Sequence, residues 1–178
     1  IEKQLYRVPL KGGKGEQLPE NGYWNEAVMD ASASRIIVTR SSVNQPPQTY
    51  LADANGKRIR WIEENRLDGD HPYAPYLASH QPVTFGTIKA ADGQTLHYYM
   101  IRPAEDSSGA KRPVWSQHYG GPGVQRVTNQ WKGALPQYIA DQGYIFFELD
   151  NRGMSGRGKA FEDPIYHAMG TVEVADQL

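Results

Sequence analysis

The sequence predicts a mixed fold, with antiparallel β-structure in the first third of the chain and the start of a mixed α/β sheet after it. In the first third, short runs of β-branched and aromatic residues are separated by Gly, Pro, Asn and Asp, as expected of strands joined by turns. The second part runs through a hairpin, a strand, a glycine-rich loop, a helix and a buried strand. This is the order in which a mixed α/β sheet begins.

Four short strands are predicted in the first third of the chain, at residues 4–10, 35–40, 48–53 and 57–62. The last two flank the sequence Asp53-Ala54-Asn55-Gly56. Asn-Gly is a strong hairpin signal because both residues accept positive φ angles. We therefore expect these two strands to pair antiparallel.

The same part of the chain contains a weak internal repeat. Its members are separated by 44 residues, so that Gln4, Tyr6 and Gly12 recur as Gln48, Tyr50 and Gly56. A period of about 40–50 residues is typical of the four-stranded blade of a β-propeller. Residues 1–66 are therefore predicted to be the C-terminal part of a β-propeller domain, and an antiparallel meander of another kind is the alternative.

Residues 67–83 are predicted to connect two domains. The dipeptides His71-Pro72, Ala74-Pro75 and Gln81-Pro82 interrupt this stretch, and each proline biases its predecessor toward extended backbone. The stretch therefore suits neither a strand nor a helix. A long ordered loop inside one domain is the alternative.

Residues 84–178 are predicted to begin an α/β domain. Strands are expected at 84–90 and 96–102, joined through Asp92-Gly93, and at 113–118 and 144–149, with a helix at 135–140 between the last two. The run 144–149 is almost entirely apolar, which is typical of a strand covered on both faces. Near the end of the chain, Thr171 is predicted to cap a helix and Glu173 to lie near the positive end of its dipole.

Composition excludes several classes of function. The formal net charge of −1 gives no electrostatic reason to expect nucleic acid as a partner. The chain has no cysteine, which excludes disulfides, thiolate zinc sites and a cysteine nucleophile. No apolar run approaches the roughly 20 residues of a transmembrane helix. The five histidines lack metal-ligand spacing, so no metal and no cofactor is predicted.

The segment with the strongest chemical signal is Val114-Trp-Ser-Gln-His-Tyr-Gly-Gly-Pro-Gly123. A strand that leads into two glycines and a proline allows a sharp turn at the carboxyl edge of a sheet, where open α/β sheets bind their ligands. In α/β-hydrolases the loop after the third strand supplies part of the oxyanion hole. A glycine turn without a chemical role is the alternative that the glycines alone leave open.

Together with Phe146-Glu-Leu-Asp-Asn-Arg-Gly153 and Gly170-Thr-Val-Glu-Val-Ala-Asp-Gln177, this segment resembles the start of the peptidase domain in the prolyl oligopeptidase family. Within that family the chain is most similar to the bacterial dipeptidyl peptidase IV group. The resemblance implies a β-propeller followed by an α/β-hydrolase domain, with residues 84–178 forming the N-terminal part of the latter and ending before the nucleophile.

The resemblance also implies an activity. A serine peptidase of this kind would release Xaa-Pro or Xaa-Ala dipeptides from peptides with a free amino terminus. Its Ser-His-Asp triad would follow Leu178. The full-length enzyme would be a homodimer, and its location would be periplasmic or secreted. Prolyl oligopeptidase and acylaminoacyl-peptidase activities are the enzymatic alternatives, and a non-catalytic structural module is the alternative for the isolated chain.

The resemblance assigns roles to four residues. Tyr119 would donate a hydrogen bond to the oxyanion, whereas acylaminoacyl peptidases typically have histidine at this position. Arg152 would organise the floor of the active site by pairing with carboxylates such as Glu173 or Asp176. Ser155 is not predicted to be the nucleophile, because the Gly-x-Ser-x-Gly pattern fails at its last glycine.

Overall fold

The computed structural model describes residues 1–18, 20–104 and 111–178. The chain divides into two compact units. Unit 1 comprises residues 1–78 and 128–133, and unit 2 comprises residues 79–127 and 134–178. The boundary between the two units at residues 78 and 79 therefore falls inside the predicted connection 67–83. Residues 128–133 belong to unit 1, although the sequence suggested that they continue the second domain.

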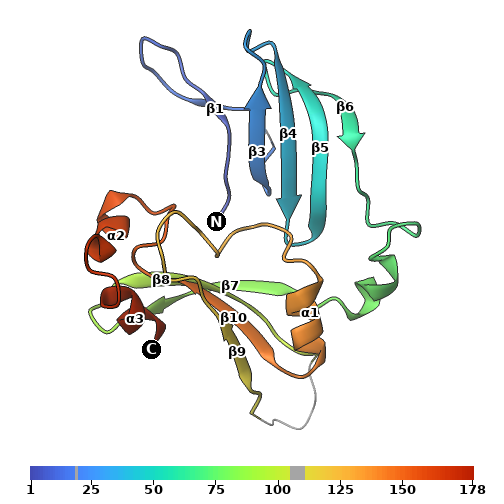
Figure 1. Cartoon of the computed structure of the whole chain (residues 1–178). Coiled ribbons are helices and arrows are strands. Elements are labelled where there is room, and N and C mark those ends of the chain that lie inside the picture. The colour runs from blue at the N-terminus through green and yellow to red at the C-terminus, as the bar shows by residue number, and fades with distance from the viewer. Residues whose placement is uncertain (19, 105–110) are drawn as a thin grey trace. The chain divides into compact units, whose positions relative to one another are not determined.

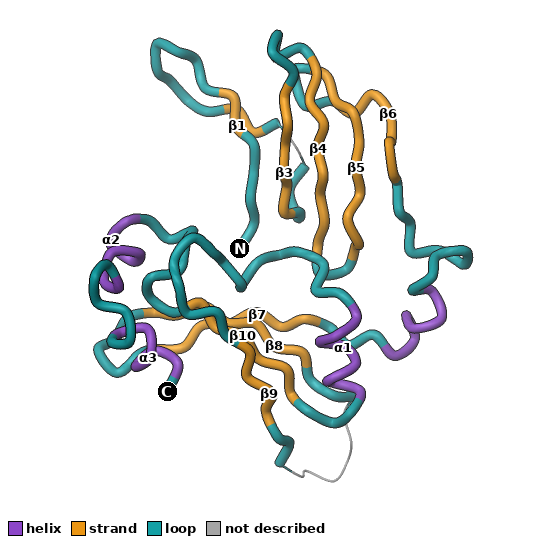
Figure 2. The backbone as a smooth tube through the Cα atoms, viewed as in Figure 1, coloured by secondary structure: helices purple, strands orange, loops and turns teal. Residues whose placement is uncertain are grey.

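Unit 1 is built on a four-stranded antiparallel sheet whose strands pair in chain order (Figures 1 and 2). The strands are β3 (Trp24–Met29), β4 (Arg35–Ser42), β5 (Gln45–Asp53) and β6 (Arg58–Glu63). A separate short pair joins β1 (Tyr6–Arg7) to β2 (Glu16–Gln17). The strand predicted at 4–10 is thus only two residues long.

One face of the sheet in unit 1 carries its core. Buried and less buried residues alternate along most of β4 and β5, because successive side chains of a strand point to opposite faces. The core consists of Ile36, Val38, Tyr50 and Ala52, against which Leu5, Leu18 and Trp61 pack. Unit 1 also contains the 3₁₀ helix η1 (Ala74–Ser79), apart from its last residue. The prediction that this stretch suits no helix was therefore wrong.

Unit 2 contains a mixed four-stranded sheet in the order β7-β8-β10-β9. Its strands are β7 (Val83–Lys89), β8 (Thr95–Ile101), β9 (Val114–Gln117) and β10 (Ile145–Asp150). Strand β10 pairs parallel with β9 and antiparallel with β8. The helices are α1 (Ala134–Asp141), α2 (Lys159–Glu162) and α3 (Val172–Gln177), with the 3₁₀ helix η2 (Asp163–Ile165) after α2.

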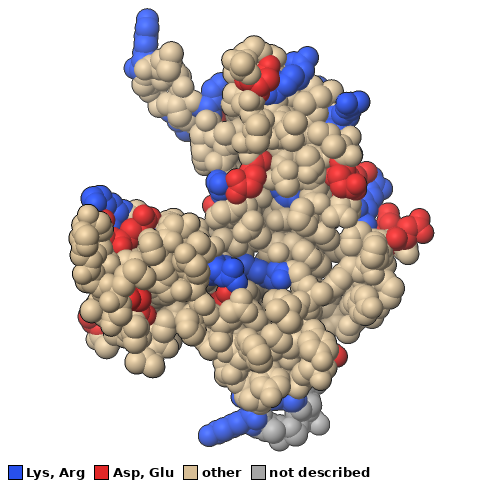
Figure 3. Space-filling model, viewed as in Figure 1, with Lys and Arg blue, Asp and Glu red and all other residues tan. Residues whose placement is uncertain are grey.

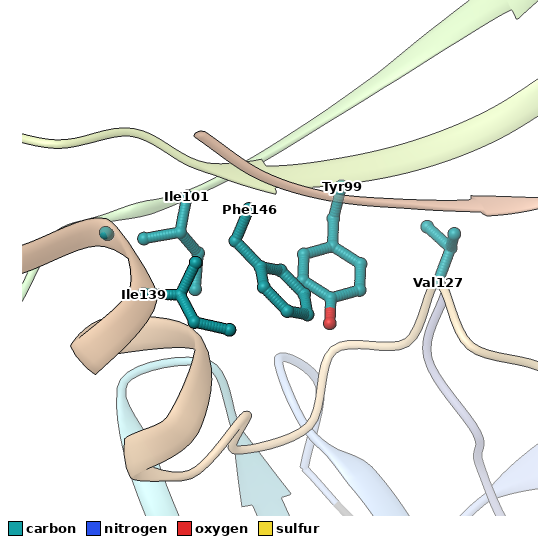
Figure 4. Close-up of a cluster of buried hydrophobic side chains, with 6 residues drawn as sticks. Tyr99, Ile101, Val127, Ile139 and Phe146 are labelled. Atoms are coloured by element: carbon teal, nitrogen blue, oxygen red, sulfur yellow. The ribbon is translucent and has the colours of Figure 1, made fainter. Parts of the chain in front are cut away.

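The main core of unit 2 lies between its sheet and α1. Figure 4 shows Ile139 of α1 close to side chains from β8 and β10. The cluster comprises Tyr99, Ile101, Val127, Ile139, Ala140 and Phe146. A second cluster joins Leu96, Leu149 and Phe161, so α2 also packs through an apolar residue. Antiparallel strands followed by a mixed sheet confirm the predicted mixed class of fold.

Charged side chains are distributed without a dominant sign. Figure 3 shows basic and acidic residues scattered among uncharged ones on one face of the chain. This distribution agrees with the net charge of −1. In the described part of the chain, no helix has the length and hydrophobicity needed to cross a bilayer.

Candidate active site

The candidate site lies in unit 2 on the loop that follows β9. Parallel strands β9 and β10 bring their carboxyl ends to the same edge of the sheet. Tyr119 is the second residue after β9, and its side chain is 53 % exposed. None of the described residues forms a hydrogen bond with its hydroxyl group. Tyr119 therefore has a donor available at the edge where α/β sheets bind ligands.

The two glycines after Tyr119 meet different local requirements, one of the backbone and one of the tyrosine ring. Gly120 has φ +82°, a left-handed conformation that side chains disfavour. Gly121 is buried, and a Cβ atom on it would lie 3.2 Å from the ring of Tyr119. The absence of a side chain at Gly121 therefore leaves room for the tyrosine ring.

Side chains at the carboxyl end of β10 form hydrogen bonds with both ends of this loop. Asp150 and Asn151 are fully buried. A carboxylate oxygen of Asp150 accepts hydrogen bonds from the backbone N–H groups of Arg126 (2.8 Å) and Val127 (3.0 Å). The Nδ2 of Asn151 donates to the carbonyl oxygen of Gly120 at 3.1 Å. Two consecutive side chains thus fix residues 120 and 126–127 relative to the sheet.

Arg152 and Asp176 form an ion pair below this edge. The guanidinium of Arg152 contacts the Asp176 carboxylate at 2.6 Å (Nη2 to Oδ1) and 3.0 Å (Nε to Oδ2), and the Arg152 backbone N–H donates to Oδ2 at 2.8 Å. The side chain of Asp176 has no exposed surface. Asp92, in the β7–β8 turn, contacts the guanidinium at 2.5 Å. The hydrogen bond with Asp176 is the main reason that the pKa of Arg152 lies above its ordinary value.

Glu173 is on the same helix as Asp176 but does not pair with Arg152. Its carboxylate accepts hydrogen bonds from the backbone N–H groups of Gly170 and Thr171. These N–H groups belong to the N-cap residue of α3 and the residue before it, so the Glu173 carboxylate reaches back over the start of its own helix. Thr171 occupies the N-cap position of α3, as predicted, but its side chain makes no capping hydrogen bond, because its hydroxyl donates to the carbonyl oxygen of Ala168 instead.

The hydrogen bond from the N–H of Gly170 is the main cause that lowers the pKa of Glu173. A group whose pKa is lowered by folding stabilises the protein above its unfolded pKa, and this contribution is lost as the pH falls through the folded pKa. We expect Glu173→Gln to be less stable than the wild type at neutral pH, with a difference that shrinks below about pH 4.3. Urea unfolding across this range measures the difference. If the difference in stability between the two proteins stays constant down to pH 3, the capping role of the Glu173 carboxylate is contradicted.

Sequence analysis missed a buried polar cluster beside the loop. Glu148 is 2 % exposed, although it is the acidic residue of a run that is otherwise almost entirely apolar before Asp150. Its carboxylate accepts a hydrogen bond from the Tyr99 hydroxyl and pairs with Nε of Arg126 at 2.6 Å. Burial is the main cause that raises the pKa of Tyr99. A glutamate inside an apolar strand was the one signal that could have indicated such a cluster.

Ser155 contacts the same loop but, within the described part of the chain, contributes no side-chain chemistry to it. Ser155 contributes its backbone, whose N–H donates to the carbonyl oxygen of Val124 at 2.9 Å. The described residues contain no group of three or more His, Asp or Glu side chains that could hold a metal ion.

The fold and the site therefore define an α/β sheet with a clamped glycine-rich loop, preceded in the chain by an antiparallel β unit. Comparison with known proteins identifies the class more closely. Residues 130–178 match the model of the prolyl oligopeptidase family. A Neosartorya fischeri protein named probable dipeptidyl peptidase 4 is 35 % identical over 99 % of this chain and 24 % of its own length. Human dipeptidyl peptidase 8 is 34 % identical over 100 % of this chain and 20 % of its own length.

A solved structure agrees with these sequence matches. The crystal structure of Porphyromonas gingivalis dipeptidyl peptidase 4 matches 99 % of this chain and 25 % of its own, with a TM-score of 0.87 and 26 % identity. The predicted resemblance is confirmed: the chain carries a segment of the prolyl oligopeptidase family, of the kind found in dipeptidyl peptidases. It spans between a fifth and a quarter of the length of these three proteins.

Proposed function

We propose that the full-length protein is a serine peptidase that releases dipeptides from the free amino terminus of peptides, with proline or alanine as the second residue. The names of the relatives support the class of reaction. The observation in this chain that carries the proposal is the half-exposed Tyr119, on a loop clamped at both ends at the carboxyl edge of the sheet.

In this proposal Tyr119 acts when the scissile carbonyl is attacked. A serine hydroxyl adds to the carbonyl carbon while a histidine takes its proton, and negative charge develops on the carbonyl oxygen. The Tyr119 hydroxyl donates a hydrogen bond to that oxygen. A phenol hydroxyl is a neutral hydrogen-bond donor and can therefore stabilise the developing charge. The serine, the histidine and the acid would come from sequence beyond Leu178.

The remaining parts of the proposal concern the whole protein. Unit 1 would belong to a β-propeller, which its four consecutive antiparallel strands support. A homodimer and a periplasmic or secreted location are proposed by analogy with bacterial dipeptidyl peptidases. Size-exclusion chromatography with light scattering and fractionation of the source cells would test these two points.

Product analysis tests the proposed reaction. The full-length protein is incubated with a peptide that has proline at its second position and a free amino terminus, and the products are identified by mass spectrometry. We expect the dipeptide and the shortened peptide, and no cleavage of the same peptide after amino-terminal acetylation. Internal cleavage of the acetylated peptide would indicate a prolyl oligopeptidase, and release of an acetylated amino acid would indicate an acylaminoacyl peptidase.

A further inference from the structure

Two side-chain amides link helix α3 to the loop that carries Tyr119. The Nε2 of Gln177, the last residue of α3, donates to Oδ1 of Asn151 at 2.8 Å. The Nδ2 of Asn151 in turn donates to the carbonyl oxygen of Gly120 at 3.1 Å. Gly120 directly follows Tyr119 in the chain. Three segments separated in sequence are therefore joined by consecutive hydrogen bonds.

The Asn151 amide has partners on both of its sides, and Gln177 supplies the one on the carbonyl side. Asn151 is fully buried, so its carbonyl and NH₂ groups need partners within the protein. Gln177 occupies the carbonyl side, which directs the NH₂ group toward the carbonyl oxygens of Gly120 and, at 2.6 Å, of Arg152. Reversing the amide would place its oxygen against two carbonyl oxygens and its NH₂ group against a donor. The amide therefore has one favourable orientation.

The position of Gln177 is itself fixed by its neighbour. Asp176 precedes Gln177 and is held by the backbone N–H and the guanidinium of Arg152. Arg152 directly follows Asn151 in the chain. The Arg152–Asp176 ion pair and the Asn151–Gln177 hydrogen bond therefore join the same two segments, which are the last turn of α3 and the end of β10. These contacts connect the last turn of α3 to the carbonyl of Gly120.

We infer that Asn151 and Gln177 are positioning residues for Tyr119, an inference that rests on the proposed function. Neither side chain has to touch the substrate. Asn151 fixes the carbonyl group of Gly120, and this restricts the backbone that presents the Tyr119 hydroxyl. Gln177 acts one step further away, by orienting Asn151. Small errors in the placement of a catalytic donor reduce turnover more than substrate binding.

A double-mutant cycle in the full-length enzyme tests this inference. Gln177→Met removes the amide at similar size and is expected to lower kcat about tenfold, with KM changed by less than about twofold. In the Tyr119→Phe background the same substitution should have almost no further effect on kcat, because the donor that it positions is already absent. Gln142→Met is the matched control, since Gln142 is an exposed glutamine after α1. It should leave kcat unchanged in both backgrounds.

The cycle separates a positioning role from a general structural one. If Gln177→Met lowers kcat by the same factor with and without Tyr119, or leaves kcat unchanged in the wild type, the inference is wrong. If Gln177→Met does not fold, Gln177→Asn replaces it, because it keeps an amide that is too short to reach Asn151. If Tyr119→Phe alone leaves kcat unchanged, the proposed oxyanion role fails instead.

Hydrogen exchange provides a readout that does not depend on activity. Amide exchange in the segment 118–125 should be faster in Gln177→Met than in the wild type. The N–H groups of Arg126 and Val127 are held by Asp150 and serve as an internal reference. Unchanged exchange in 118–125 would show that Gln177 does not restrain the loop, and would overturn the inference even for an inactive preparation.

Discussion

Replacing Tyr119 by phenylalanine in the full-length enzyme is expected to lower kcat about 10²–10³-fold, which corresponds to about 2.7–4 kcal/mol of lost transition-state stabilisation. The hydroxyl would interact with charge that develops only after the serine attacks, so KM should change little. The ring is retained, and Gly121 still accommodates it without a clash. Steady-state kinetics with an Xaa-Pro substrate at saturating and limiting concentrations separates the two constants.

Tyr138→Phe is the matched control for this experiment. Tyr138 lies on α1 and is 62 % exposed, so loss of its hydroxyl should leave both kcat and KM unchanged. A Tyr119→Phe enzyme with wild-type kcat would remove Tyr119 from the oxyanion site. A purely raised KM would indicate that the hydroxyl binds the substrate before reaction and not the transition state.

Asp176→Asn is expected to cost about 3 kcal/mol in the free energy of unfolding, because it leaves the Arg152 guanidinium without its buried counter-charge. Only 15 % of the Arg152 side chain is exposed, so water cannot replace the lost carboxylate. Asparagine keeps the size of the side chain and one acceptor for the Arg152 N–H, which restricts the change mainly to charge. Urea unfolding at neutral pH, followed by circular dichroism, measures the loss.

Asp92→Asn provides the comparison on the same guanidinium. The Asp92 side chain is 55 % exposed, and exposed ion pairs contribute little to stability. Its replacement should therefore have a much smaller effect than that of Asp176. Equal losses for the two variants would mean that burial of Asp176 does not determine the strength of the pair.

Much of the sheet structure was predictable from local pattern. Strands β4 to β6, the β7–β8 hairpin, β9, α1 and β10 lie within a few residues of their predicted positions. In these strands apolar and polar residues alternate, or apolar residues form a short run next to a glycine. Such patterns indicate which faces of a strand are buried. Strand β3 was missed because most of its residues are exposed. Its pairing with β4, and not its own composition, makes it a strand.

The site was predictable only in part, for a similar reason. Tyr119 was selected from its glycine motif and Arg152 from its place at a strand end, and both are local signals. The partners of Glu148 lie 49 and 22 residues away in the sequence, so no local pattern connects them. From the sequence alone, Glu173 and Asp176 were equally plausible as partners of Arg152. The direction of each side chain on α3 decides between them, and that direction is set by tertiary packing.

The most direct test of this account is the ratio of kcat/KM for an Xaa-Pro anilide with a free amino terminus to kcat/KM for its acetylated form, measured on the full-length protein. A dipeptidyl peptidase must recognise the free ammonium group, so we expect turnover of the free substrate and none detectable for the acetylated one. Equal turnover of both substrates, or turnover of the acetylated one alone, would contradict the proposed function.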